Sequence, residues 1–152
     1  MQHLIPSTAT DRSKQMDFML ALFRPWLRTE EAGFLLDDAS EWHVRDLIDE
    51  GKLLAINIAC ATETRRDLRV YRYSVEHRIM APQRALTVVS PEEIIPHHRP
   101  TILRREMASW LACSEAHVGN LQLDGPRDGH DSRHRIYRTS AVSFLTERLI
   151  KP

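Results

Sequence analysis

One short pattern occurs twice in this chain, and this duplication restricts the possible folds more than any other feature. Three blocks recur: residues 27–35 as 103–111, 40–44 as 114–118, and 70–74 as 136–140. The offset between matched residues falls from 76 to 74 and then to 66, so the length changes lie between the blocks, where loops tolerate them. The sequence therefore predicts two copies of one small domain.

The chain has 152 residues, enough for two very small domains. Copies of about 55 residues are near the lower limit for independent folding, so we expect the two copies to pack together and stabilise each other. We place an N-terminal helix and the first copy in residues 1–80, a linker in 81–100 and the second copy in 101–152. The N-terminal helix, over residues 13–23, is amphipathic and could cover the first copy or form a homodimer contact.

Each copy is predicted as a helix, a turn, a second helix, a β-hairpin and a last helix. In the first copy, Thr29 caps a helix over 28–36, Ser40 caps a helix that buries Val44, Leu47 and Ile48, and Gly51 ends it. Strands at 53–59 and 68–73 form the hairpin, and a helix covers 74–80.

The second copy repeats this order with a shorter hairpin. Its expected segments are a helix over 103–111, a helix from Ser114 to about Leu123, Gly125, a hairpin through Asp128-Gly129, and a helix over 140–150.

The repeated residues resemble the phage excisionase and MerR-like winged helix-turn-helix family. The shared pattern is Glu-x-Ala-x-x-Leu, then Ser-x-x-x-Val-x-x-Leu, then Gly, then a hairpin that ends in Tyr-Arg. Its positions are Glu30, Ala32, Leu35, Ser40, Val44, Leu47, Gly51, Tyr71 and Arg72 in the first copy, and Glu106, Ala108, Leu111, Ser114, Val118, Leu121, Gly125, Tyr137 and Arg138 in the second. The resemblance implies an α+β fold of two tandem winged helix-turn-helix domains, each a three-helix unit with a hairpin wing. It also implies that each second helix enters the major groove of double-stranded DNA.

The candidate DNA-binding residues lie on the second helices and on the wings. They are His43, Arg45, Arg65, Arg66, Arg69, Arg72, His117, Asn120, Gln122, Arg127, Arg133, Arg135 and Arg138. Arginines on a wing can bind DNA phosphates, and Asn or Gln can recognise adenine through two hydrogen bonds. A histidine at both equivalent positions, 43 and 117, could instead be a polar position kept through duplication, and the first wing could be a solvated face.

Charge leaves a second function open. Lys and Arg number 21 and Asp and Glu number 21, so formal net charge is zero, and the second helix of the first copy carries four carboxylates against one arginine. Phosphate binding needs a clustered positive field, whereas acidic helices repel DNA. The DNA-binding protein would be a transcriptional regulator or an excisionase-like architectural factor. The alternative is a protein–protein adaptor that has lost DNA binding, with Trp42 at an interface.

Other classes receive no support from the sequence. We find no phosphate-binding glycine loop, no Gly-x-Ser-x-Gly and no paired carboxylates, so no enzyme and no cofactor are expected. The histidines at 97, 98, 130 and 134 with Cys113 match no standard zinc spacing, so no metal site is expected. Two isolated cysteines, no apolar run of membrane length and no signal peptide favour a cytoplasmic protein without a membrane partner.

Overall fold

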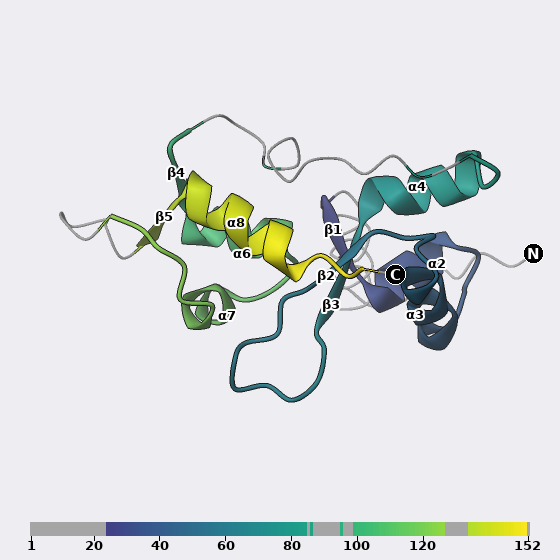
Figure 1. Cartoon of the computed structure of the whole chain (residues 1–152), viewed down its shortest axis with the longest axis horizontal. Helices are drawn as coiled ribbons and strands as arrows, with labels where there is room; N and C mark the ends of the chain where they lie inside the picture. Colours follow the sequence, from purple (N-terminus) through teal and green to yellow (C-terminus); the bar gives the residue numbers. More distant parts are fainter. Residues whose placement is uncertain (1–23, 85, 87–94, 96–98, 127–133, 152) are drawn as a thin grey trace, which may run out of the picture.

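The structure, a computed structural model, describes residues 24–84, 86, 95, 99–126 and 134–151 and has the predicted α+β class (Figure 1). Within these residues the chain forms six helices and five short strands. They are β1 (Trp26–Arg28), α2 (Thr29–Leu35), α3 (Glu41–Asp49), β2 (Ala55–Asn57), β3 (Leu68–Tyr71), α4 (Arg72–Met80), β4 (Thr101–Leu103), α6 (Arg104–Trp110), α7 (Glu115–Asn120), β5 (Arg135–Tyr137) and α8 (Arg138–Arg148). The helix expected over 13–23 and the hairpin tip at Asp128-Gly129 lie outside the described residues.

In the first copy, α2 and α3 pack beside a three-stranded antiparallel sheet of order β1-β3-β2. The inner face of α3 is Val44, Leu47 and Ile48, each at most 4% exposed, as their helical spacing predicts. Burying an aliphatic side chain of this size contributes about 1.5–3 kcal/mol. The amphipathic pattern of α3 therefore accounts for its packing.

Two of the predicted caps in the first copy are confirmed and one is wrong. The Ser40 hydroxyl accepts a hydrogen bond from the His43 N–H at 3.2 Å, and Gly51 follows α3 with a left-handed φ of 75°. Thr29 is the first helical residue rather than the cap. The cap is Arg28, whose N–H donates to the Glu31 carboxylate at 2.8 Å. A glutamate three residues into the helix thus satisfies the exposed N-terminal amide.

The second copy repeats hydrogen bonds of the first. The Ser114 hydroxyl accepts from the His117 N–H at 3.1 Å, as Ser40 does from His43. The Arg138 N–H donates to the Pro100 carbonyl at 2.9 Å, and the Arg72 N–H donates to that of Pro25 at the same distance. The structure thus supports the duplication through bonds that no sequence pattern contains.

The first repeated block is offset by one residue less than the sequence match suggests. β1 corresponds to β4 and α2 to α6 at an offset of 75, because the carboxylate that caps α6 is Glu106 and its counterpart is Glu31, not Glu30. A short run of similar residues matched by coincidence one position out of register. Phe34, which the match placed opposite Trp110 in the core, is 52% exposed.

The alignment of Gly51 with Gly125 is also wrong. The Tyr137 N–H donates to the Asp124 carbonyl at 2.8 Å, as the Tyr71 N–H does to that of Leu54. Gly125 therefore corresponds to the residue after Leu54, in β2. Among the described residues of the second copy no strand takes the place of β2, and β5 pairs only with β4.

The two copies share a core. One buried cluster joins Trp26, Ile56, Ile58 and Tyr71 of the first copy to apolar residues of β4, α6, α7, β5 and α8. A further cluster lies within the first copy, between α2, α3 and the sheet. The mutual support expected of two such small domains is therefore present as a continuous apolar interior.

The segment after α8 returns to the first copy. Leu149 forms an antiparallel bridge with Ile56, and the Ile150 N–H donates to the Ala55 carbonyl at 2.9 Å. The helix expected over 140–150 therefore ends at Arg148, and the next two residues close the outer edge of β2. None of the helices in the described ranges has the length and apolarity that crossing a bilayer requires.

Candidate functional site

Two charged clefts occupy equivalent places in the two copies. Each lies between the start of the first helix, the start of the second helix and the β-strand that precedes the last helix. The first, of about 310 Å³, is lined by Arg28, Thr29, Glu30, Glu41, Arg45, Arg66, Asp67, Leu68 and Arg69. The second, of about 430 Å³, is lined by Leu103, Arg104, Arg105, Glu115, His134 and Arg135. Duplication has thus produced two hollows with the same walls and different charges.

The first cleft is close to neutral because three of its four arginines pair with nearby carboxylates. Arg66 lies 3.6 Å from Asp49, and Arg28 lies 4.0 Å from Glu30. Arg69 is 2.6 Å from Asp67. Ion pairs of this kind reduce the field that an approaching anion experiences.

The second cleft keeps its positive charge. Arg104, Arg105 and Arg135 line it with a single carboxylate, Glu115. None of the three arginines forms a salt bridge within the described part of the chain. The Nε of Arg104 is buried and has no hydrogen-bond partner among those residues. A guanidinium that is held by packing and left without an anion is suited to bind one from solution.

The two second helices present different exposed groups. On α3, His43 is exposed and Arg45 stacks over the ring of Trp42, with its guanidinium carbon 5.8 Å from the ring centre. Trp42, whose counterpart in the second copy is not aromatic, is 77% exposed. On and after α7, Asn120 and Gln122 are exposed. Three of these four predicted groups are therefore accessible, and Arg45 is half-buried.

Arg69 does not lie on an exposed wing face. Its side chain is 9% exposed, and its Nε and Nη2 donate to the main-chain carbonyls of Leu111 and Ala112 at 2.7 and 3.1 Å. The alternating pattern of β3 predicted exposure, but the second copy covers that face. Arg72 is also partly covered, with Glu76 at 3.7 Å.

The other predicted residues are dispersed. Arg65 and Arg66 are exposed on the β2–β3 loop, whereas Arg135 and Arg138 are half-buried. Arg127 and Arg133 lie outside the described residues. Arg28, Arg104 and Arg105 line the clefts but were not predicted. An Arg-Arg pair at the start of an expected helix was the signal available for the last two.

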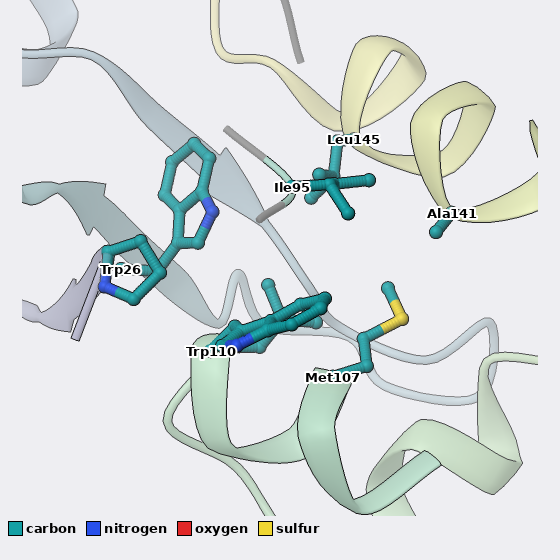
Figure 2. Close-up of a pocket in the computed structure, with 8 residues that line it drawn as sticks. Trp26, Ile95, Met107, Trp110, Ala141 and Leu145 are labelled. Carbon is teal, nitrogen blue, oxygen red and sulfur yellow. The ribbon is translucent and has the colours of Figure 1, made fainter. Parts of the chain in front are cut away.

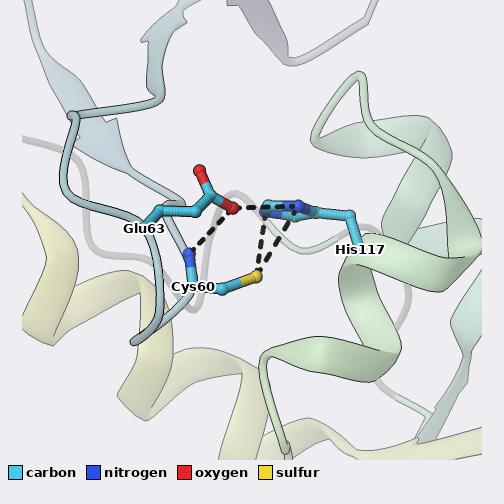
Figure 3. A group of neighbouring side chains, drawn as sticks. All are labelled: Cys60, Glu63 and His117. Atoms are coloured by element: carbon cyan, nitrogen blue, oxygen red, sulfur yellow. Dashed lines mark hydrogen bonds and ion pairs between the residues drawn. The ribbon is translucent and has the colours of Figure 1, made fainter.

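His117 points away from the basic cleft, toward the first copy (Figure 3). Its Nε2 lies 2.6 Å from the Ile58 carbonyl, and its Nδ1 lies 3.7 Å from both the Cys60 sulfur and the Glu63 carboxylate. His117 is therefore half-buried, because the β2–β3 loop of the first copy covers it, which agrees with the alternative of a polar position kept through duplication. This cluster is the one set of His, Cys, Asp and Glu in the described residues that could hold a metal ion.

The copies also enclose a small apolar pocket (Figure 2). It is lined by Pro25, Trp26, Ile95, Met107, Trp110, Leu111, Ala141 and Leu145, and its free volume of about 10 Å³ is barely that of one water. We interpret it as a packing gap in the shared core.

Comparison with protein-family models, with curated proteins and with solved structures finds no match to this chain.

Proposed function

We propose that the chain binds double-stranded DNA, and that the second copy supplies most of the affinity. The observation that carries the proposal is the basic cleft of Arg104, Arg105 and Arg135, which is lined by one carboxylate and whose arginines form no salt bridge with the residues that the structure describes. Clustered guanidinium groups release condensed counterions from phosphates and favour binding.

The arrangement of the elements supports a tandem winged helix-turn-helix fold. Each copy has two helices joined by a tight turn, followed by the strand that leads into the third helix. In a helix-turn-helix, the second helix enters the major groove and the first crosses the DNA backbone. Arg104 and Arg105 begin the first helix, α6, and Arg135 lies on β5, and all three line one cleft with Glu115 at the start of α7, where they would contact phosphates beside that helix.

Sequence preference would come from the exposed side chains of α7. Asn120 is exposed on this helix, and Gln122 follows it. An amide side chain can bond adenine through two hydrogen bonds, and each good base contact discriminates by about 1–3 kcal/mol. The chain would then act as a transcriptional regulator or as an excisionase-like architectural factor.

The test is fluorescence anisotropy with labelled random duplex DNA at several salt concentrations. Arg105→Ala should weaken binding and lower the salt slope by about one unit, because one phosphate contact is lost. Arg66→Ala is the matched control, since that arginine is exposed but already pairs with Asp49 at 3.6 Å. Asn120→Ala should change sequence preference rather than the salt slope. Equal effects of the two arginine substitutions, or no duplex binding at low salt, would overturn the proposal.

A protein–protein adaptor is the second candidate, and the exposed Trp42 favours it. This indole is 77% exposed on α3, a helix whose outer face also carries Glu41, Asp46 and Asp49. Exposed aromatic residues are enriched at protein interfaces, and the acidic face opposes phosphate. If the parent chain binds no duplex at low salt, the adaptor becomes the favoured function. Trp42→Ser should leave DNA binding unchanged under the first proposal.

A further inference from the structure

We propose that Cys60, Glu63 and His117 form a binding site for one zinc ion, which joins the β2–β3 loop of the first copy to α7 of the second. The three ligand atoms are a sulfur, a carboxylate oxygen and an imidazole nitrogen, and they lie within 4.8 Å of one another (Figure 3). Zinc is bound in proteins by these three kinds of ligand.

The distances suit a tetrahedral ion. With Zn–S near 2.3 Å and Zn–N near 2.0–2.1 Å, tetrahedral angles separate sulfur and nitrogen by about 3.6 Å. The Cys60 sulfur is 3.7 Å from Nδ1 of His117, and the Glu63 carboxylate oxygen is 3.7 Å from the same nitrogen. The sulfur is also 3.8 Å from Nε2, so it lies beside the ring edge, and a rotation of the His117 and Cys60 side chains would aim Nδ1 and the sulfur at one ion. Three protein ligands leave a fourth position for water.

One nitrogen of the histidine ring is already bonded to the protein. Nε2 lies 2.6 Å from the Ile58 carbonyl, which can only accept, so Nε2 donates its proton there. Nδ1 is left for a metal ion and lies 3.7 Å from both the Glu63 carboxylate and the Cys60 sulfur. A carbonyl bonded to the distal ring nitrogen is the usual outer support of a zinc-bound histidine.

A tight turn in the first copy sets the other two ligands side by side. The Glu63 N–H donates to the Cys60 carbonyl at 2.9 Å, and the Cys60 N–H donates to the Glu63 carboxylate at 3.3 Å. Asn57 braces the base of the loop by accepting from Ala59 and Asp67 N–H groups, each at 3.0 Å. The Cys-x-x-Glu spacing thus presents both ligands on one side before any ion binds.

The same three residues do not fit a catalytic triad. In a triad the carboxylate orients the histidine through the nitrogen opposite the nucleophile. Here Glu63 faces Nδ1, but Nε2, the opposite nitrogen, lies 2.6 Å from the Ile58 carbonyl and 3.8 Å from the Cys60 sulfur, so it is already bonded and not free to accept the thiol proton.

The experiment uses the full chain without a metal-binding tag, reduced and then titrated with zinc or cobalt. We expect one metal per chain by mass spectrometry, and a thiolate-to-cobalt charge-transfer band in the near ultraviolet. Cys60→Ser should remove that band and Glu63→Gln should weaken cobalt affinity by about 10- to 100-fold. The matched controls are Cys113→Ser and His43→Gln, which change the other cysteine and the exposed histidine that corresponds to His117. Both should bind cobalt as the parent does.

A measurement on the parent protein makes the test independent of whether Cys60→Ser folds. Zinc at 100 times its dissociation constant should slow alkylation of Cys60 about 100-fold, because only the metal-free fraction reacts. Alkylation of Cys113 should not change. The proposal is overturned if the reduced parent binds no stoichiometric metal, if zinc leaves Cys60 alkylation unaffected, or if His43→Gln weakens binding as much as His117→Gln.

Discussion

The guanidinium of Arg69 donates to the main-chain carbonyl of Leu111 in the other copy, with 2.7 Å between Nε and the oxygen. Nη2 of the same group reaches the Ala112 carbonyl at 3.1 Å, and Nη1 pairs with Asp67. These carbonyls end α6, where helices leave acceptors unsatisfied and favour cations. One buried arginine thus joins the sheet of the first copy to a helix end of the second.

Replacing Arg69 should therefore destabilise the whole chain. We expect Arg69→Met to lower the free energy of unfolding by about 2–4 kcal/mol, since it leaves the Leu111 carbonyl without this donor and Asp67 without its ion pair, while the Ala112 carbonyl keeps the Nε donor of Arg28 at 3.3 Å. Arg135→Met, at the equivalent position of the second copy, lines an open cleft and should cost less than about 1 kcal/mol. Urea unfolding followed by circular dichroism measures both. Similar losses for the two variants would contradict the bridging role of Arg69.

Gly125 should not accept a side chain. A Cβ at this position would lie 2.0 Å from the Arg135 carbonyl oxygen, which is backbone and cannot move alone. We expect Gly125→Ala to cost about 1–3 kcal/mol through forced displacement of β5. Gly119→Ala is the control, because its Cβ would approach only side-chain atoms of Arg104, at 3.3 Å or more and not backbone, and alanine favours a helix by up to about 1 kcal/mol. Thermal unfolding should separate the two variants in opposite directions, and a neutral Gly125→Ala would refute the close approach.

The hydroxyl groups of Ser74 and Ser140 accept equivalent hydrogen bonds from backbone N–H groups, but in different surroundings. The Ser74 hydroxyl accepts from the Leu54 N–H at 3.1 Å and donates to the Tyr71 carbonyl at 2.7 Å, and the residue is 1% exposed. The Ser140 hydroxyl accepts from the Asp124 N–H at 3.0 Å in a more open place. Ser74→Ala should cost about 1–3 kcal/mol, because a buried N–H loses its acceptor, and Ser140→Ala should cost less. Denaturant midpoints of the two variants provide the comparison, which fails if their order is reversed.

Cys113 should be an unreactive thiol. Burial raises its pKa from 9.0 to about 11, so at pH 8 the folded chain holds about 100-fold less thiolate than an ordinary cysteine would. Alkylation by iodoacetamide, mapped by peptide mass spectrometry, should be correspondingly slow in the folded chain and fast in urea. Equal rates in the two states would show that the thiol is not shielded.

The same shift has a consequence for stability. Below pH 9 the Cys113 thiol is neutral in both states, whereas between pH 9 and about 11 the unfolded chain loses this proton and the folded chain retains it. This thiol should therefore lower stability as the pH rises through that interval. Cys113→Ala should flatten the decline, as followed by urea midpoints in alkaline buffers. If stability declines with pH in Cys113→Ala as it does in the parent, other groups cause the decline.

Local patterns predicted the helices better than the contacts between the copies. The serine caps, Gly51 and the buried face of α3 were readable because each depends on residues a few positions apart. β1 and β4 were missed, since three residues are too few to show a two-residue period. The burial of Arg69 and His117 depends on the other copy, which no local pattern contains.

The candidate site was recovered only in part for the same reason. The basic wing residue Arg135 and the exposed Asn120 were identified, but Arg104 and Arg105 become relevant only when α6 and β5 are brought together. The ligand cluster was missed because Cys60 and His117 are 57 residues apart, far from any standard zinc spacing. Duplication was visible in the sequence, whereas the divergence of the two clefts was visible only in three dimensions.

The pairing of Leu149 and Ile150 with β2 also determines when the chain can complete its fold during synthesis. Domains generally fold as they emerge from the ribosome, N-terminal parts first. Here the outer edge of β2 stays open, and Trp26 and Ile56 stay without their partners in the second copy, until Leu149 and Ile150 have been translated. Until then the nascent first copy exposes an unpaired strand edge and apolar surface, the condition under which chaperones bind.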